Sequence, residues 1–166
     1  MTDGNELAAQ FIRDVNWNDL PEVVQHQAKQ CLVDIVAAMV SGVLAPISDI
    51  AAGYAPIAWP GDEATILLHG NRATAAGAAF ANACAANGLD CDDGGAYTRG
   101  HQGAQVFPTA LAISESLRLS GSEMLAAAVA GYEVSHRFAR CWHDYLHPVY
   151  QADGSWGSVA SAATAA

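Results

Sequence analysis

Positively charged residues are scarce in this chain of 166 residues, in which seven Lys and Arg stand against seventeen Asp and Glu, for a formal net charge of −10. Lys29 is the one lysine. Binding to nucleic acid or to an anionic membrane needs an excess of basic residues, so the sequence predicts neither partner. It also lacks a run of about eighteen apolar residues and, at its start, MTDGNE, any signal-peptide pattern. We therefore expect a cytoplasmic protein.

Aromatic residues are also few, at 8% of the chain, although apolar residues make up 52%. The core must therefore consist mainly of alanine, valine, leucine and isoleucine, whose modest size favours closely packed helices. The four cysteines lie far apart and form no CxxC pair. This spacing predicts reduced thiols in the core rather than disulfides or metal ligands.

Hydrophobic periodicity predicts an all-α fold, a bundle of helices rich in small residues. The expected helices cover residues 5–15, 22–41, 48–58, 72–87, 108–119, 124–142 and 158–166, with at most one short strand at 64–68. Asp19 with Glu22, and Ser120 with Glu123, are typical of helix starts. Asn71 is expected to cap the helix over residues 72–87, which consists mostly of alanine, glycine and asparagine. Side chains this small let helices approach closely, so we place it at the centre of the bundle or at a subunit interface.

One polar stretch, residues 87–104 (NGLDCDDGGAYTRGHQGA), interrupts these helices. Asp90, Asp92 and Asp93 concentrate negative charge, which destabilises a fold unless something binds there or a carboxyl pKa rises. The glycines that follow, Gly94, Gly95, Gly100 and Gly103, allow sharp turns and the close approach of another molecule. His101 is of the residue type that titrates near neutral pH, and Arg99 offers a bidentate grip on a carboxylate. The stretch is therefore the candidate functional site.

Several stretches, in this order and spacing, resemble the MmgE/PrpD family, which includes 2-methylcitrate dehydratase and cis-aconitate decarboxylase. They are LAAQFIRDVNWNDLPEVVQHQAKQCLVDIVAAMVSG, ATILLHGNRATAAGAAFANACAANGLDCDDG, GHQGAQVFPTALAISESL, GYEVSHRFAR and YQADGSWGSVASAATAA. The resemblance implies a helical fold, a homodimer, and no need for a metal or an organic cofactor. Members of the family are longer and have a second, α/β domain. Residues 1–166 are therefore expected to be the N-terminal portion of the family's helical domain.

The resemblance also implies site residues. The first aspartate of the family's LDxDD motif falls on Asp90, and the histidine before a small-residue turn falls on His101 in GHQGA. Two positions depart from the pattern, with Gln102 where many relatives have proline and Gly94 where some have threonine. The family's second site histidine aligns with Gln151, which cannot pass a proton as an imidazole does. Lysines that relatives contribute come from positions beyond residue 166.

The candidate catalytic residues are thus Asp90, His101 and Asp93, and the candidate substrate-binding residues are Arg99 and Gln151. Dehydration, decarboxylation and epimerisation of a polycarboxylic acid all move a proton at a carbon next to a carboxylate. They need an acid or base active near neutral pH, a neighbour that orients it, and cations for the substrate. His101 fits the first role, and Asp90 or Asp93 fits the second. Together with these residues, the resemblance implies a lyase or isomerase that acts on a small polycarboxylic acid by cofactor-free proton transfer. With one cation in the loop, we expect residues 1–166 alone to have little activity.

The enzyme is the first interpretation, and two alternatives to it stay open. The second interpretation is a non-catalytic helical dimerisation scaffold, or a fragment that needs further chain, whose aspartate loop is vestigial or binds a cation. A third interpretation is a metal hydrolase that combines the aspartates with His143 and His147, whose spacing of four residues places two ligands on one helix face.

Overall fold

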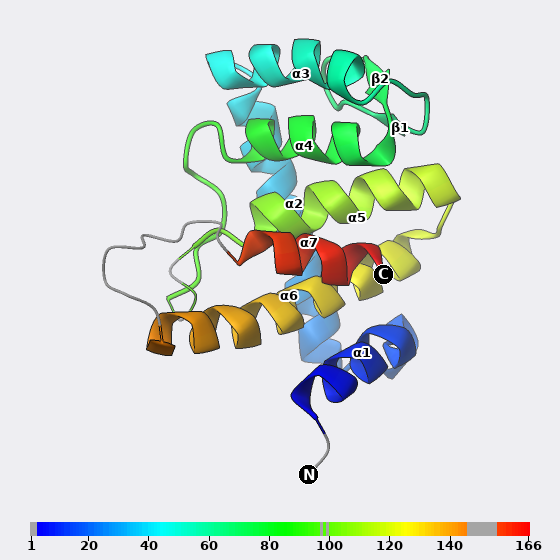
Figure 1. Ribbon diagram of the computed structural model, residues 1–166, viewed down its shortest axis with the longest axis vertical. Helices are drawn as coiled ribbons and strands as arrows, with labels where there is room; N and C mark the ends of the chain where they lie inside the picture. The colour runs from blue at the N-terminus through cyan, green and yellow to red at the C-terminus, as the bar shows by residue number, and fades with distance from the viewer. Residues whose placement is uncertain (1–2, 97, 99, 146–155) are drawn as a thin grey trace.

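The computed structural model describes residues 3–96, 98, 100–145 and 156–166, without the side chains of residues 142–145. Figure 1 shows α3 (Pro46–Ala58), α4 (Ala75–Ala86) and α5 (Gly103–Leu117) as successive layers, followed by α7 (Gly157–Ala165) and α6 (Gly121–Tyr145). The helix α1 (Gly4–Asp14) lies at the far end, and α2 (Glu22–Gly42) crosses behind the layers. The predicted all-α fold is therefore confirmed.

Of the two predicted capping motifs, one is confirmed and one is wrong. Glu123 Oε2 accepts from the Ser120 backbone N–H at 2.7 Å, and Ser120 Oγ accepts from the Glu123 N–H at 3.3 Å, which is a reciprocal capping box. Asp19, in contrast, lies in a short 3₁₀ helix, Trp17–Asp19, and Pro21 precedes α2 without a side-chain cap. Proline fits this place because its fixed φ suits a helix entrance and it has no N–H to satisfy.

The predicted strand exists, but it pairs with a segment that we expected to be helical. β1 (Ala64–Thr65) pairs antiparallel with β2 (Arg72–Ala73). Helix α4 therefore begins at Ala75 rather than residue 72, and Thr74 instead of Asn71 caps it, accepting from the Gly77 N–H at 3.3 Å. Tertiary contacts explain the difference, because Arg72 is held by ion pairs with Asp62 and Glu115.

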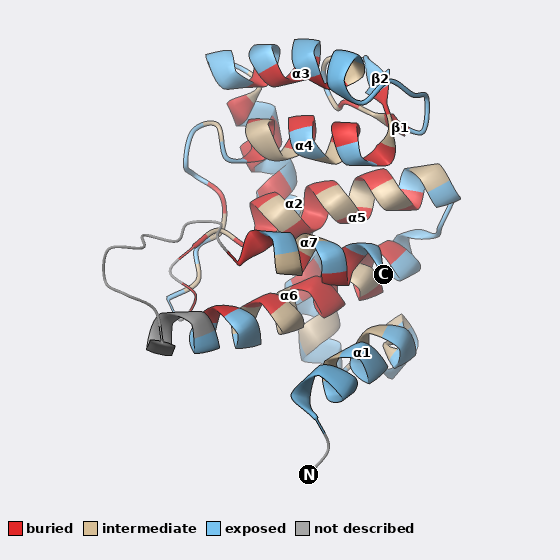
Figure 2. Cartoon of the chain, viewed as in Figure 1, coloured by how far each residue is buried: buried red, intermediate tan, exposed pale blue. Residues whose placement is uncertain are grey.

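Helix α4 occupies the centre of the bundle, as its small residues predict. It packs against α3 on one side and α5 on the other, and α2 crosses it. Figure 2 shows buried positions along its length. Close approach is most acute where α2 crosses it, because a Cβ atom on Gly42 would overlap the backbone oxygen of Ala85. A buried asparagine, Asn82, also fixes the hairpin to α4, accepting from the Leu67 N–H at 2.8 Å and donating to the Thr65 oxygen at 3.1 Å.

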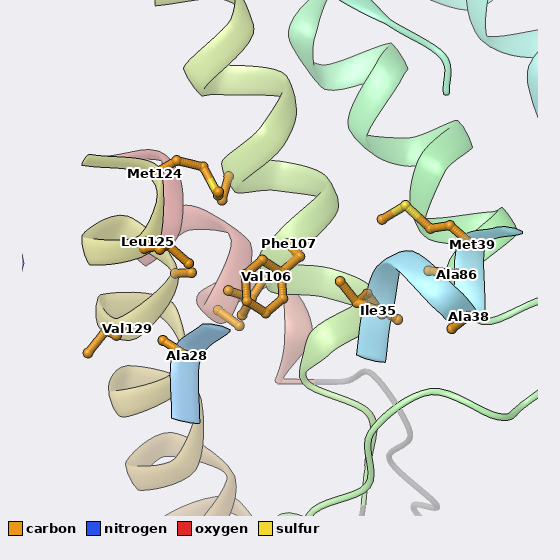
Figure 3. Packing of buried hydrophobic residues seen from close by; sticks show 14 of the residues in the cluster. Ala28, Ile35, Ala38, Met39, Ala86, Val106, Phe107, Met124, Leu125 and Val129 are labelled. Carbon is orange, nitrogen blue, oxygen red and sulfur yellow. The ribbon is translucent and has the colours of Figure 1, made fainter. Parts of the chain in front are cut away.

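The core is built on both sides of α5. On one side, alanines of α3 and α4 pack with Ile66 and Ala112. On the other side, Figure 3 shows Phe107 and Val106 of α5 between side chains of α2 and α6, among them Ile35 and Leu125. The sequence predicts that Pro108 opens α5, but the helix begins at Gly103 and Pro108 is buried within it. The earlier start reflects a capping contact from Asp93, described below.

The four cysteines are all unpaired, as predicted, but only two of them are partly buried. Cys31 and Cys84 are half-buried, whereas Cys91 and Cys141 are exposed. The expectation that these thiols belong to the core is therefore wrong for Cys91 and Cys141. Cys91 is exposed because it belongs to the polar loop. Cys141 is exposed because it lies near the C-terminal end of α6.

Helices α2 and α3 meet at a sharp bend of 95°. Residues 43–45 make the turn, and Pro46 takes the first position of α3, where its missing N–H leaves no helical hydrogen bond unmade. Together the two helices are apolar enough to span a membrane, but no single helix of the described chain has both the length and the hydropathy to do so.

The α2–α4 crossing gives a stability test with a matched control. Gly42→Ala should destabilise the fold by about 1–3 kcal/mol, because the added methyl group must push two backbones apart. Gly53→Ala, in α3, should stabilise it by about 0.5–1 kcal/mol, because nothing lies within 4 Å of the new Cβ and alanine favours the helix. Urea denaturation measures both. Equal effects would contradict the close crossing.

Candidate functional site

The polar loop connects the end of α4 to the start of α5 and turns back on itself, as the loop beside these helices in Figure 1 shows. Helix α4 ends at Ala86, and the Asp90 N–H then donates to the Asn87 oxygen at 3.0 Å. Asp90 has a left-handed backbone, with φ of 54°, which aspartate tolerates better than most residues. Gly95 donates to the oxygen of Gly100 at 3.0 Å and closes the return of the chain. The turn brings the two ends of the loop together.

His101 and Asp90, the two principal candidates, meet at this closure. His101 Nε2 lies 3.3 Å from Asp90 Oδ1. The side chain of Asp90 is 81% exposed, and that of His101 is 26% exposed. The pair is therefore reachable from solvent on the Asp90 side, which an acid or base that acts on a ligand requires.

Asp92, to which sequence reasoning assigns no role, contacts the other ring nitrogen. His101 Nδ1 lies 3.4 Å from Asp92 Oδ1 and 3.2 Å from the Asp92 backbone oxygen. The Asp92 side chain is wholly buried; Oδ1 accepts from Asn87 Nδ2 at 3.2 Å, and Oδ2 has no hydrogen-bond partner in the described structure. Burial raises the pKa of this carboxyl, against the opposing effects of its own backbone N–H, His101 and Asn87. The sequence offers one signal for Asp92, which is its position two residues after Asp90 in the same turn.

Asp93 does not contact the imidazole. Its Oδ1 accepts from the Gly103 N–H at 2.7 Å, and its Oδ2 accepts from the Tyr132 hydroxyl at 2.7 Å. The carboxylate thus binds the first N–H of α5, where negative charge is favoured, and joins α5 to α6. Burial and the neighbouring Asp93 raise the pKa of the Tyr132 phenol far above its ordinary value, so Tyr132 remains a donor. Sequence reasoning missed Tyr132, because only the fold brings a residue 39 positions away to Asp93.

The remaining candidates are placed less fully. Arg99, Gln151 and His147 lie outside the described residues, and the side chain of His143 is not described. The two positions that depart from the expected pattern are described. Gln102 is buried and donates to Thr98 Oγ1, whereas nothing lies within 4 Å of a Cβ built on Gly94. A larger residue would therefore fit at position 94.

The site presents a small polar group at an open surface. Ligand atoms of Asp90, Asp92 and His101 lie within 4.8 Å of one another, close enough to hold a cation. Both ring nitrogens are, however, within reach of these carboxylates, so the same side chains form a hydrogen-bonded acid–base group by themselves. A cavity of about 570 Å³ lies between α1, α6 and α7, and one of about 340 Å³ lies between α2, α5 and α6; Asp90 and His101 line neither.

The contact between Asp93 and Tyr132 can be tested through stability. Tyr132→Phe removes a donor from a partly buried carboxylate, and we expect the free energy of unfolding to fall by about 1–3 kcal/mol. Tyr54→Phe, at a 54% exposed ring, is the control and should change it by less than about 0.5 kcal/mol. Urea denaturation of both variants gives the comparison, and equal values would argue against the contact.

Comparison with known proteins places this geometry in a family. No curated protein matches the chain by sequence. The MmgE/PrpD N-terminal domain, in contrast, matches residues 6–166, which is nearly the whole chain. The match covers the helical bundle and the loop that carries Asp90, Asp92 and His101. The chain therefore belongs to the MmgE/PrpD family and corresponds to its N-terminal domain.

Proposed function

We propose that this chain carries the acid–base group of a lyase or isomerase that acts on a small polycarboxylic acid without a metal or organic cofactor. His101 is the acid or base, and Asp90 orients the imidazole or the substrate. The observation that carries the proposal is the position of the His101 ring, which lies between Asp90 on its exposed side and Asp92 on its buried side. Membership of the MmgE/PrpD family supports the same reaction class.

The contacts of His101 suit a group that exchanges protons. Its ring is held in orientation by the loop and by Asp92, so little side-chain freedom is lost when a ligand arrives. Its Nε2 faces the exposed carboxylate, from which side a substrate carbon can approach. An imidazole there takes the proton from the carbon next to a carboxylate, or returns a proton to a leaving hydroxyl or to that carbon.

The negative charge of the loop sets the remaining requirement. A di- or tricarboxylate beside Asp90 and Asp92 must be held by cations, for which the sequence offers Arg99 within the loop. We propose that Arg99 and Gln151 hold the substrate, and that further cations come from chain beyond these residues. Asp93 acts indirectly, by fixing the start of α5 next to His101.

Proton transfer can be measured without knowing which reaction follows it. Citrate, methylcitrate, aconitate and related acids are incubated with the protein in D₂O, and ¹H NMR follows loss or exchange of the proton next to the carboxylate. The longest natural chain that contains these residues is tested beside residues 1–166, which we expect to be weakly active. His101→Gln should lower the rate at least about 100-fold, the usual contribution of a general acid or base.

The matched control is His26→Gln, which changes an exposed histidine on α2 and should leave the rate unchanged. Asp90→Asn should lower the rate with the fold intact, because Asp90 is exposed. Wild-type rates in the His101→Gln variant would contradict the proposal. Turnover by residues 1–166 alone at the rate of the longer chain would contradict the need for further cations.

An exposed apolar surface favours a second candidate function, assembly with a second copy of the chain. Large apolar side chains, 43–85% exposed, recur every three or four residues along α2, the turn after it and α3. They are Val33, Val36, Val40, Leu44, Ile47, Ile50, Tyr54 and Ile57. Residues 33–57 contain two charged residues, Asp34 and Asp49, in a chain of net charge −10. Copies that repel elsewhere can meet through this part of the surface.

The area agrees with a dimer. At about 60–120 Å² of apolar surface for each aliphatic side chain, eight half-exposed side chains offer roughly 400 Å². A stable interface buries about 800 Å² on each partner, of which more than half is apolar. We therefore propose a homodimer through α2 and α3. In the scaffold interpretation, this assembly is the whole function.

Analytical ultracentrifugation at micromolar concentration tests the dimer. The wild-type chain should sediment as a dimer, and Ile50→Asp, on α3, should sediment as a monomer. Leu117→Asp, at the end of α5, is the control at a side chain of similar exposure, 63% against 65%, and should remain dimeric. A monomeric wild type would contradict the interface. Dimerisation of this chain, with no substrate-proton exchange by the longest natural chain that contains it, would favour the scaffold over the enzyme.

A further inference from the structure

The imidazole of His101 lies between two carboxylates that differ in their surroundings. Asp92 Oδ1 and the Asp92 backbone oxygen lie 3.4 Å and 3.2 Å from Nδ1, and Asp90 Oδ1 lies 3.3 Å from Nε2. The Asp92 side chain is wholly buried, whereas that of Asp90 is 81% exposed. A neutral imidazole has one N–H, so the two sides compete for a single proton.

Burial decides this competition. Water competes with the exposed Asp90 carboxylate for hydrogen bonds, and exposed ion pairs contribute little. At Nδ1, the partner carboxylate is wholly buried, the interaction is stronger in the lower dielectric, and two acceptors belong to the same residue. A histidine tautomer is set by the hydrogen bond that one ring nitrogen makes, which leaves the other nitrogen free to react.

We propose that Asp92 is a positioning residue, whose buried carboxylate and backbone oxygen keep the proton of the neutral His101 ring on Nδ1, so that Nε2 is the nitrogen that exchanges protons with the ligand. The protonated ring then donates to both aspartates, and the proton that leaves it is the one at Nε2. The catalytic meaning of this arrangement rests on the proposed function, whereas the tautomer itself does not.

The cost of Asp92 to the fold supports such a role. Its Oδ2 atom is buried and has no hydrogen-bond partner among the described residues, and burial raises the pKa of the carboxyl. A carboxyl whose pKa rises on folding destabilises the fold at any pH above that raised value. A residue that only stabilised the loop would serve better as a neutral amide. Asp92→Asn should therefore fold, with a melting temperature no lower than that of the wild type.

The tautomer is measured by ¹⁵N NMR of the ring nitrogens, on residues 1–166 with labelled histidine, at a pH at which the ring is neutral. The His101 signals are assigned by their loss in His101→Gln. Wild-type His101 should show a protonated Nδ1 and an unprotonated Nε2. Asp92→Asn should shift the ring toward the Nε2–H form, because the amide lacks the charge that held the proton and Asp90 still accepts at Nε2.

Asp90→Asn is the matched control, with the same chemical change on the opposite side of the ring, and should leave the proton on Nδ1. A wild-type ring protonated at Nε2, or a tautomer that changes in Asp90→Asn and not in Asp92→Asn, would overturn the proposal. The wild-type spectrum alone tests it, whether or not the variants fold. Because no turnover is involved, the expected tautomer in residues 1–166, together with no substrate exchange by the longest natural chain that contains these residues, would refute the proposed function and leave the role of Asp92 intact.

Discussion

The close approach of α4 to the helices around it is the constraint on which the rest of the structure depends. Alanine and glycine bring its axis near α2, α3 and α5, to the point where α2 has no room for a Cβ at Gly42. This packing sets the position in space of the end of α4 relative to the start of α5. The polar loop spans those two ends, so the distance between Asp90 and His101 is set by alanine packing in the core rather than by the loop alone. The geometry of the candidate site and the composition of the core are thus linked through one helix.

Periodicity and composition were sufficient to predict most of the fold. Apolar spacing predicts the helical segments, and small side chains predict the central place of α4. The errors concern places where a distant group changes a local preference. Residues 72–73 form a strand because Arg72 is drawn to Asp62 and Glu115, and α5 starts before Pro108 because Asp93 binds the N–H of Gly103. Neither contact leaves a trace in the local pattern.

The candidate site, too, can be predicted from the sequence only in part. Glycines on either side of the loop signalled a turn, and a turn of that length brings Asp90 to His101. The division of labour among the three aspartates was not predictable, because it depends on which side of the chain faces the core. Consecutive residues of the turn point in different directions, so Asp92 is buried beside Nδ1 while Asp93 faces Tyr132. Arg99 and Gln151, which lie outside the described residues, remain predictions.

The bond between Asp93 and the first amide of α5 determines how the loop can move. A loop attached only at its two ends can swing as a flap, but this one is joined in its middle to two core helices, at Gly103 and at Tyr132. Opening the loop requires unwinding the first turn of α5. Val106 and Phe107, at the end of that turn and directly after it, are buried. Local opening free energy in this region should therefore approach that of the surrounding core rather than that of a surface loop. A ligand that approaches from the Asp90 side needs no such opening, because that side chain is 81% exposed.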